Sequence, residues 1–489
     1  MAVFSDPGRA RTREAAVTLA GTLLAFGCTL ALKHGAGLTT SSVLLAVVLS
    51  LSVGRQLTDR HSRHRSMLLG FILLPFFAVG ATEIGTRMFT HPNLGDTLFV
   101  VGMSGAILLR QFGEVGRRAG TLVSTALTAT LIAPGPVVAI GPGAPSRWWG
   151  AIVALIALTS VRVTRVIAER AGALPVKPVE VRPAPVPTRS ATTGRPWYRR
   201  VPVSTKLALQ MAGALAGAFA AGRSMFGVHW TWTVLTAFIV SSGSRGRGDV
   251  TQKAVLRVAG AAGGTLIATA LANAFPAHDD WSVVTIFAVL AVALWLRPVS
   301  YAFWAAGVTA ALALLYGFYG EQGNHLLLDR LEGILIGAGI GVVGAWLVFP
   351  IRNVDVIRRQ LAIALGAIAA RLQGDEPVFP PATVALIRES THSAELTAKS
   401  LSWLRVFPVR WQSPLPYAAA SHALAGCARA LAALPDHRLA LSAEAQHQLT
   451  RDVTTARKAL AADAARDQVV KLPAVSKRIA AAIGSAKQG

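Results

Sequence analysis

Three charged residues stand close together inside an otherwise apolar stretch that ends near residue 350. They are Asp329, Arg330 and Glu332. On a helix, the carboxylates of Asp329 and Glu332 share a face at i, i+3 spacing, with Arg330 on its flank. A carboxylate in such a position could exchange protons, and Arg330 could bind a substrate carboxylate through a two-pronged contact. The alternative is a local salt-bridge cluster that fixes the end of the helix.

Five more residues in apolar surroundings could carry chemistry. Glu83 and Arg87 lie four residues apart, so they could line a substrate path or simply neutralise each other. Trp230 and Trp232 could stack on an aromatic substrate, although Trp is also common where helices meet the membrane surface. Arg257 could attract organic anions; alternatively, its long side chain reaches lipid phosphates.

Enzyme signatures are missing from the sequence. It contains no Walker loop, no HExxH, no G-x-S-x-G and no CxxC. Its two cysteines exclude a disulfide framework and a Cys-based zinc site. We therefore expect no enzyme, no cofactor and no metal, and any pumping must draw on an ion gradient or on a partner protein.

The composition is that of a membrane protein. Hydrophobic residues make up 53% of the 489 residues and charged residues only 15%, against about 25% charged in soluble domains. The formal net charge of +24 would ordinarily indicate nucleic-acid binding. Because the basic residues gather between apolar runs, we interpret them as cytoplasmic loops in contact with membrane lipids, and we expect no nucleic-acid partner.

Runs that approach the length needed to cross a bilayer occur in two sets of six. The first set covers approximately residues 15–32, 38–53, 66–88, 95–109, 119–140 and 148–168. The second covers approximately residues 203–226, 230–243, 255–275, 281–296, 299–319 and 326–350. The sequence therefore predicts an all-α, polytopic membrane protein of about 12 transmembrane helices. Loops rich in Lys and Arg alternate with loops that hold few, which predicts cytoplasmic N- and C-termini.

Four segments follow from these patterns. They are a first transmembrane repeat (1–170), a Pro-rich cytoplasmic linker (171–200), a second repeat (201–350) and a cytoplasmic helical domain (351–489). The repeat rests on matched positions: His91 and His278 are 187 residues apart, as are Arg110 and Arg297. Six helices per unit would give both units the same orientation, an arrangement found in transporters whose substrate path lies between the repeats.

A Trp-initiated helix, an Arg/Gly loop and a helix rich in small residues follow one another in Val228–Ala272. This order resembles the fusaric acid resistance (FUSC) family, also called the aromatic acid exporter family. The matching positions are Arg257, Gly260, Gly264 and Thr265. The later stretch Asp329–Pro350 is similar to the family's Arg-Glu-x-x-x-Gly helix, although it reads Arg-Leu-Glu-Gly from Arg330.

The resemblance implies a secondary transporter that exports aromatic or other amphipathic carboxylic acids across the bacterial inner membrane, driven by protons, and it suggests a homodimer. In that mechanism Arg330 or Arg257 binds the acid, and Glu332 or Asp329 titrates during alternating access. Two alternatives remain open. One is a passive organic-anion channel, because plant malate channels are similar in layout. The other is a non-transporting membrane scaffold or envelope protein whose tail recruits partners.

Overall fold

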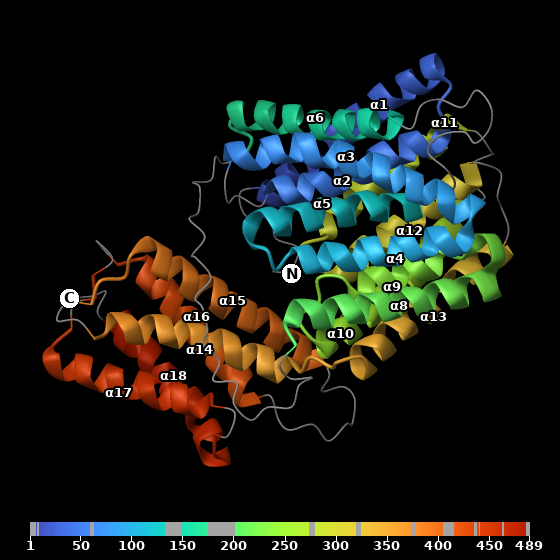
Figure 1. The fold of residues 1–489 in the computed structure, drawn as a ribbon. Coiled ribbons are helices and arrows are strands. Elements are labelled where there is room, and N and C mark those ends of the chain that lie inside the picture. Colours follow the sequence, from blue (N-terminus) through green and yellow to red (C-terminus); the bar gives the residue numbers. More distant parts are fainter. Residues whose placement is uncertain are drawn as a thin grey trace. The chain divides into compact units, whose positions relative to one another are not determined.

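The structure of the protein is a computed structural model. It describes residues 6, 9–58, 63–132, 148–174, 201–272, 279–318, 324–373, 377–403, 415–434, 438–439, 441–461 and 464–485. Within these residues the regular elements are helices, with one isolated antiparallel bridge between Val378 and Arg438 (Figure 1). The all-α class predicted from the apolar runs is therefore confirmed.

The first set of apolar runs forms helices. They are α1 (Ala10–Ala36), α2 (Thr40–Thr58), α3 (Arg63–Thr90), α4 (Pro92–Leu109), α5 (Gly113–Ile132) and α6 (Trp149–Arg170). Gly37 ends α1 in a left-handed conformation, at φ 65°, which glycine adopts without strain. Pro92 begins α4, where the missing N–H has no helical acceptor to lose. The predicted continuation of the fifth run to residue 140 lies outside the described residues.

The second set of runs also forms helices. They are α8 (Val203–Phe226), the short 3-10 turn η3 (Gly227–His229), α9 (Thr231–Ser241), α10 (Arg247–Ala272), α11 (Asp280–Leu296), α12 (Tyr301–Phe318) and α13 (Asn324–Leu347). With 11 residues, α9 is the shortest of these α-helices. At 1.5 Å per residue it is about 16 Å long, roughly half of the ~30 Å hydrocarbon thickness. It is followed by the Arg/Gly loop predicted from the sequence.

Seven of the described helices are long and apolar enough to cross a membrane, namely α1, α3, α4, α6, α10, α12 and α13. Shorter apolar helices are found in α2, α9 and α11. Large apolar side chains such as Phe76, Leu266 and Leu347 are 69%, 73% and 76% exposed. Water would disfavour so much exposed apolar surface, whereas lipid accommodates it. These helices therefore form a multi-pass membrane domain, and the number of 12 crossings stays a prediction.

Helices α1–α6, α8, α9, α11–α13 and most of α10 form one compact unit. In its first half α1 packs on α2 and α6, and in its second half α8 packs on α9 and α13. This correspondence supports the internal repeat, which stays a prediction. The halves meet where α4 packs along α8 (Figure 1). The buried cluster there joins Met88 and Phe99 of the first half to Phe219 and Trp230 of the second.

A second compact unit contains residues 243–252 and 350–489. Its helices are α14 (Asn353–Arg371), α15 (Pro381–Trp403), α16 (Leu415–Ala432), α17 (Ala443–Ala459) and α18 (Arg466–Ser485). They bury a common apolar core that includes Leu361, Leu424 and Ile479, as amphipathic helices of a bundle do. The four domain boundaries stay predictions, and residues 175–200 of the expected linker lie outside the described residues.

Candidate functional site

Arg330 is buried within the second half of the membrane unit. Its residue exposure is 2%, and its Nε and Nη1 atoms have no hydrogen-bond partner. The guanidinium carbon lies over the ring of Trp232, 5.9 Å from the ring centroid. Arg330 stands six residues after the start of α13 at Asn324, which places it about 9 Å along the helix axis. The arginine is therefore enclosed by protein between one and two turns from the start of α13.

Arg257, on α10, is the second buried arginine of this region. Its residue exposure is 3%, and its Nε atom also has no hydrogen-bond partner. Arg257 and the Tyr316 side chain of α12 both lie within electrostatic range of the Arg330 guanidinium. Arg257, Arg330, Trp232 and Tyr316 are called the arginine cluster below. The sequence singled out the first three, and in the structure Arg330 is the residue that links the other three.

Glycines allow the helices of the arginine cluster to approach closely. On α13, a Cβ added at Gly333 would lie 3.2 Å from Thr233 Oγ1, and one added at Gly337 would meet the Thr233 carbonyl oxygen. On α10, a Cβ at Gly260 or Gly264 would collide with backbone carbonyls of α12. Such close packing is typical of membrane helices that carry small residues four positions apart. These contacts hold Trp232 beside Arg330, and α10 beside α12.

The described residues do not balance the positive charges of Arg257 and Arg330. Among the described residues, no carboxylate contacts the guanidinium of Arg257 or Arg330. Burying an unpaired cation costs several kcal/mol, and two neighbouring cations also repel each other. An anion with oxygen acceptors would neutralise the charge and accept the unused N–H groups. The arrangement is therefore suited to binding an anion.

Asp329 and Glu332 lie away from the arginine cluster. Both are exposed, whereas Arg330 between them is buried. Adjacent helix positions differ by about 100°, so Arg330 can face the protein while the two carboxylates share the outer face. The structure thus keeps the predicted i, i+3 pair of carboxylates together but does not bring it to Arg330.

The two tryptophans have different surroundings. Trp230 is buried between the halves, where it contacts Phe219 with ring centroids 5.3 Å apart and lies under Arg223 at 4.4 Å. Trp232 belongs to the arginine cluster and stacks on His229 with ring centroids 4.6 Å apart. Tyr316 meets Trp232 edge-on at 5.9 Å. Both tryptophans therefore hold arginines through ring contacts within the protein.

Glu83 and Arg87 pair with each other on α3. The Nε atom of Arg87 donates to Glu83 Oε1 over 2.9 Å, with side-chain exposures of 40% and 30% for Arg87 and Glu83. This is the local ion pair that the four-residue spacing allows. The structure does not bring the pair to the arginine cluster.

In the second half of the membrane unit, three buried threonines that sequence reasoning passed over have hydroxyls without a hydrogen-bond partner. Thr233 and Thr236 of α9 and Thr309 of α12 are each 0% exposed, and their Oγ1 atoms lack a hydrogen-bond partner. Threonine in an apolar helix normally bonds to a carbonyl of the preceding turn. No signal in a single sequence shows which threonines depart from that rule.

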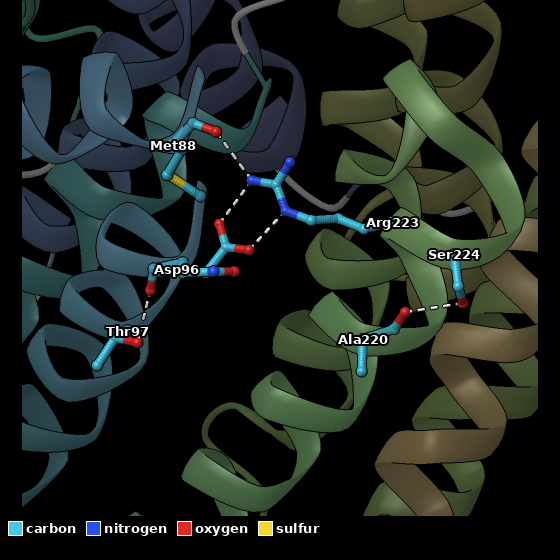
Figure 2. A network of polar contacts seen from close by, with 7 residues as sticks. Met88, Asp96, Thr97, Ala220, Arg223 and Ser224 are labelled. Atoms are coloured by element: carbon cyan, nitrogen blue, oxygen red, sulfur yellow. Dashed lines mark hydrogen bonds and ion pairs between the residues drawn. The ribbon is translucent and has the colours of Figure 1, made fainter. Parts of the chain in front are cut away.

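An ion pair between the halves was also missed. Figure 2 shows Arg223 of α8 reaching Asp96 of α4, with Nη2 at 2.7 Å from Asp96 Oδ1 and 2.9 Å from the Met88 carbonyl oxygen. The side chains of Arg223 and Asp96 are 27% and 14% exposed. The available signal was one charged residue inside each of the two apolar runs. No signal showed that these two residues, 127 positions apart, would pair with each other.

The described residues contain no group of three His, Cys, Asp or Glu side chains that could hold a metal ion.

Comparison with known families gives a match for residues 211–344, to the family described as fusaric acid resistance protein-like. The matched segment includes all four residues of the arginine cluster. Comparison with curated proteins and with solved structures found no match. The chain is thus a multi-pass membrane protein whose residues 211–344 are similar to the fusaric acid resistance protein-like family.

Proposed function

We propose that the protein is a secondary transporter that exports aromatic or other amphipathic carboxylic acids across the bacterial inner membrane. The observation that carries this proposal is the arginine cluster, in which Arg257 and Arg330 are 3% and 2% exposed with unused N–H groups. A carboxylate offers the paired oxygen acceptors that a guanidinium binds most strongly. The similarity of residues 211–344 to the fusaric acid resistance protein-like family supports a role in membrane transport.

Arg330 is the primary carboxylate ligand in this proposal. Trp232 holds its guanidinium in place, and Arg257 adds a second positive charge. Alternating access would expose this cluster to one side of the membrane and then to the other. The direction of transport and the proton coupling rest on the resemblance to aromatic acid exporters. Asp329 and Glu332 are the candidate titrating groups, and they would act from the exposed face of α13.

A passive organic-anion channel is the second candidate. It is favoured by one observation: among the described residues, no carboxylate contacts the guanidinium of Arg257 or Arg330 to couple proton release to anion binding. Channels need a favourable but weakly held anion site and no titrating partner. The two candidates share the arginine cluster and differ in whether an anion can be accumulated against its gradient.

Uptake of labelled 4-hydroxybenzoate and fusaric acid into inside-out membrane vesicles tests both candidates. We expect accumulation that an uncoupler abolishes, at least tenfold lower uptake for Arg330→Gln, and loss of accumulation for Glu332→Gln. Arg451→Gln removes an exposed charge from α17 and is the control for net charge. Equilibration without accumulation would favour the channel. Absence of flux with every acid would overturn the substrate class and favour the scaffold alternative.

A further inference from the structure

The number of buried positive charges in the arginine cluster determines how much negative charge its ligand must have. Each of the two guanidiniums is at least nine-tenths buried, and Arg257 acts electrostatically on Arg330. The groups that act electrostatically on Arg330 are Tyr316 and Arg257. Neither supplies a counter-charge while the phenol is protonated. The cluster thus holds two positive charges for which the described residues provide no negative partner.

A single carboxylate would neutralise only one of these charges. The remaining guanidinium would stay buried and unpaired, at a cost of several kcal/mol. A ligand with two negative groups would pair with both arginines and remove their mutual repulsion. The unused N–H groups fit this requirement, because Arg330 has them at Nε and Nη1 and Arg257 has one at Nε.

The surroundings of Trp232 indicate that charge, more than ring stacking, selects the ligand. His229 stacks on the Trp232 ring, Tyr316 meets it edge-on, and Arg330 lies over it. These contacts within the protein use the ring to position Arg330. The discriminating feature of a ligand would then be its second anionic group, which reaches Arg257.

We infer that the ligand class of the arginine cluster is an organic dianion, with one carboxylate on Arg330 and the second on Arg257. This inference rests on the proposed function, since it takes the cluster to be the transported anion's site. Arg257 is then the residue that distinguishes a dianion from a monoanion. Arg330 contributes to the binding of both.

Calorimetric titration of the full-length protein in detergent at pH 7.5 tests the inference. The probes are benzoate and its three dicarboxylate analogues, phthalate, isophthalate and terephthalate, which keep the ring and add one carboxylate. We expect at least one dicarboxylate to bind the native protein ten or more times more tightly than benzoate. Arg257→Gln should abolish that preference while retaining benzoate binding, and Arg330→Gln should weaken both.

Arg257→Lys is a second variant, which keeps the positive charge and should keep a preference for the dicarboxylate. Arg451→Gln, on the exposed surface of α17, should bind all four acids as the native protein does. If benzoate binds as tightly as every dicarboxylate, or if Arg257→Gln keeps the preference, the dianion inference is overturned while the proposed carboxylate site stands. If none of the four acids binds, both are overturned.

Discussion

Arg223 of α8 and Asp96 of α4 form a two-pronged ion pair that ties the two halves of the membrane unit together. Both nitrogen donors used are on one guanidinium: Nε bonds to Oδ2 and Nη2 bonds to Oδ1 over 2.5 and 2.7 Å (Figure 2). Arg223 also lies over Trp230, at 4.4 Å from the ring centroid. Where α4 packs against α8, the Arg223 guanidinium therefore makes an ion pair, an aromatic contact and a hydrogen bond to a backbone carbonyl.

Removing one partner of this pair should destabilise the membrane unit. Asp96→Asn leaves the Arg223 guanidinium partly buried without its counter-charge, and Arg223→Gln does the same to the carboxylate. We expect each variant to lose about 1–3 kcal/mol of unfolding free energy, as for hydrogen bonds between charged groups. The losses should be strongly non-additive in the double variant, because the second substitution removes the group left unpaired. Thermal unfolding of the four proteins in detergent measures this coupling.

Neighbouring hydroxyls supply matched controls for the ion pair. Thr97 Oγ1 donates to the Asn93 carbonyl over 2.7 Å, and Ser224 Oγ donates to the Ala220 carbonyl over 2.8 Å (Figure 2). Each bond stays within its own helix, so Thr97→Val and Ser224→Ala should change the unfolding temperature little. Additive losses for Asp96→Asn and Arg223→Gln would show that the two side chains do not act as a pair.

Much of the fold could be predicted because apolar run length is a local property. A helix such as α6 shows itself by uninterrupted apolar residues between charged ends, whatever its neighbours are. The run 230–243 predicts a short helix, and α9, with 11 residues, confirms it, although both of its ends lie inside the predicted run. Helix ends depend on capping and on loop contacts, which apolar content alone does not show. The isolated bridge between Val378 and Arg438 was likewise not predictable from periodicity.

The sequence could show which residues belong to the candidate site, but it could not show whether their side chains face the protein or its surface. Arg257 and Arg330 stood out because an ionisable residue inside an apolar run is costly without a role. Which side of α13 faces the protein depends on the contact of Gly333 and Gly337 with α9, a tertiary feature. That contact buries Arg330 and leaves Asp329 and Glu332 outside. The Arg223–Asp96 pair also joins distant segments, and one sequence carries no record of such pairing.

Two glycines of α13 should differ sharply in their tolerance of a methyl group. A Cβ at Gly337 would meet the Thr233 carbonyl oxygen and approach Thr236 Cβ to 3.1 Å, whereas a Cβ at Gly339 would have no heavy atom within 4 Å. Gly337→Ala must therefore push α9 away from α13, which we expect to cost about 1–3 kcal/mol as overpacking does. Gly339→Ala should be neutral or slightly stabilising, because alanine favours the helix.

Unfolding temperatures and dicarboxylate affinities of both glycine variants check this expectation. Because α9 carries Trp232, Gly337→Ala should also weaken anion binding, whereas Gly339→Ala should not. Equal behaviour of the two variants would contradict the close contact between α9 and α13.

Cys427, in the core of the helical bundle, should resist thiol reagents while the bundle is folded. Burial raises the pKa of its thiol from the ordinary value of 9.0 to about 12. In a Cys28→Ser background at pH 8, only about one thiol in 10,000 would be ionised, and the thiolate is the reactive form. We expect maleimide labelling to be at least 100-fold slower than in the unfolded chain. Labelling at equal rates would show that Cys427 is not enclosed.

The same raised pKa predicts a dependence of bundle stability on pH. Because the folded-state pKa lies above the unfolded-state value, the contribution of the neutral thiol is fully present below about pH 9 and is lost as the pH rises towards about 12. Cys427→Ala removes this titration. The native protein should therefore lose more stability than the variant between pH 9 and pH 11, as measured by chemical unfolding. Parallel pH profiles would contradict the assignment.

Asn353 should determine how firmly the first turn of α10 is held. Its Oδ1 accepts from the Gly248 backbone N–H over 2.9 Å, and its Nδ2 donates to Ser400 Oγ of α15 over 3.0 Å. The bond to Gly248 satisfies one of the N–H groups that a helix start leaves unpaired. Asn353→Ala removes both bonds from a residue that is 3% exposed, so we expect a loss of about 1–3 kcal/mol. Asn353→Asp keeps the acceptor, and its negative charge suits a helix N-terminus, so it should cost less.

Hydrogen exchange of the amides in residues 247–251 measures the difference, with Asn93→Ala on the exposed start of α4 as the control. Faster exchange in Asn353→Ala than in Asn353→Asp would establish the cap, because only the first variant removes the acceptor. Equal exchange in both variants would assign the stabilisation to the bond with Ser400 instead.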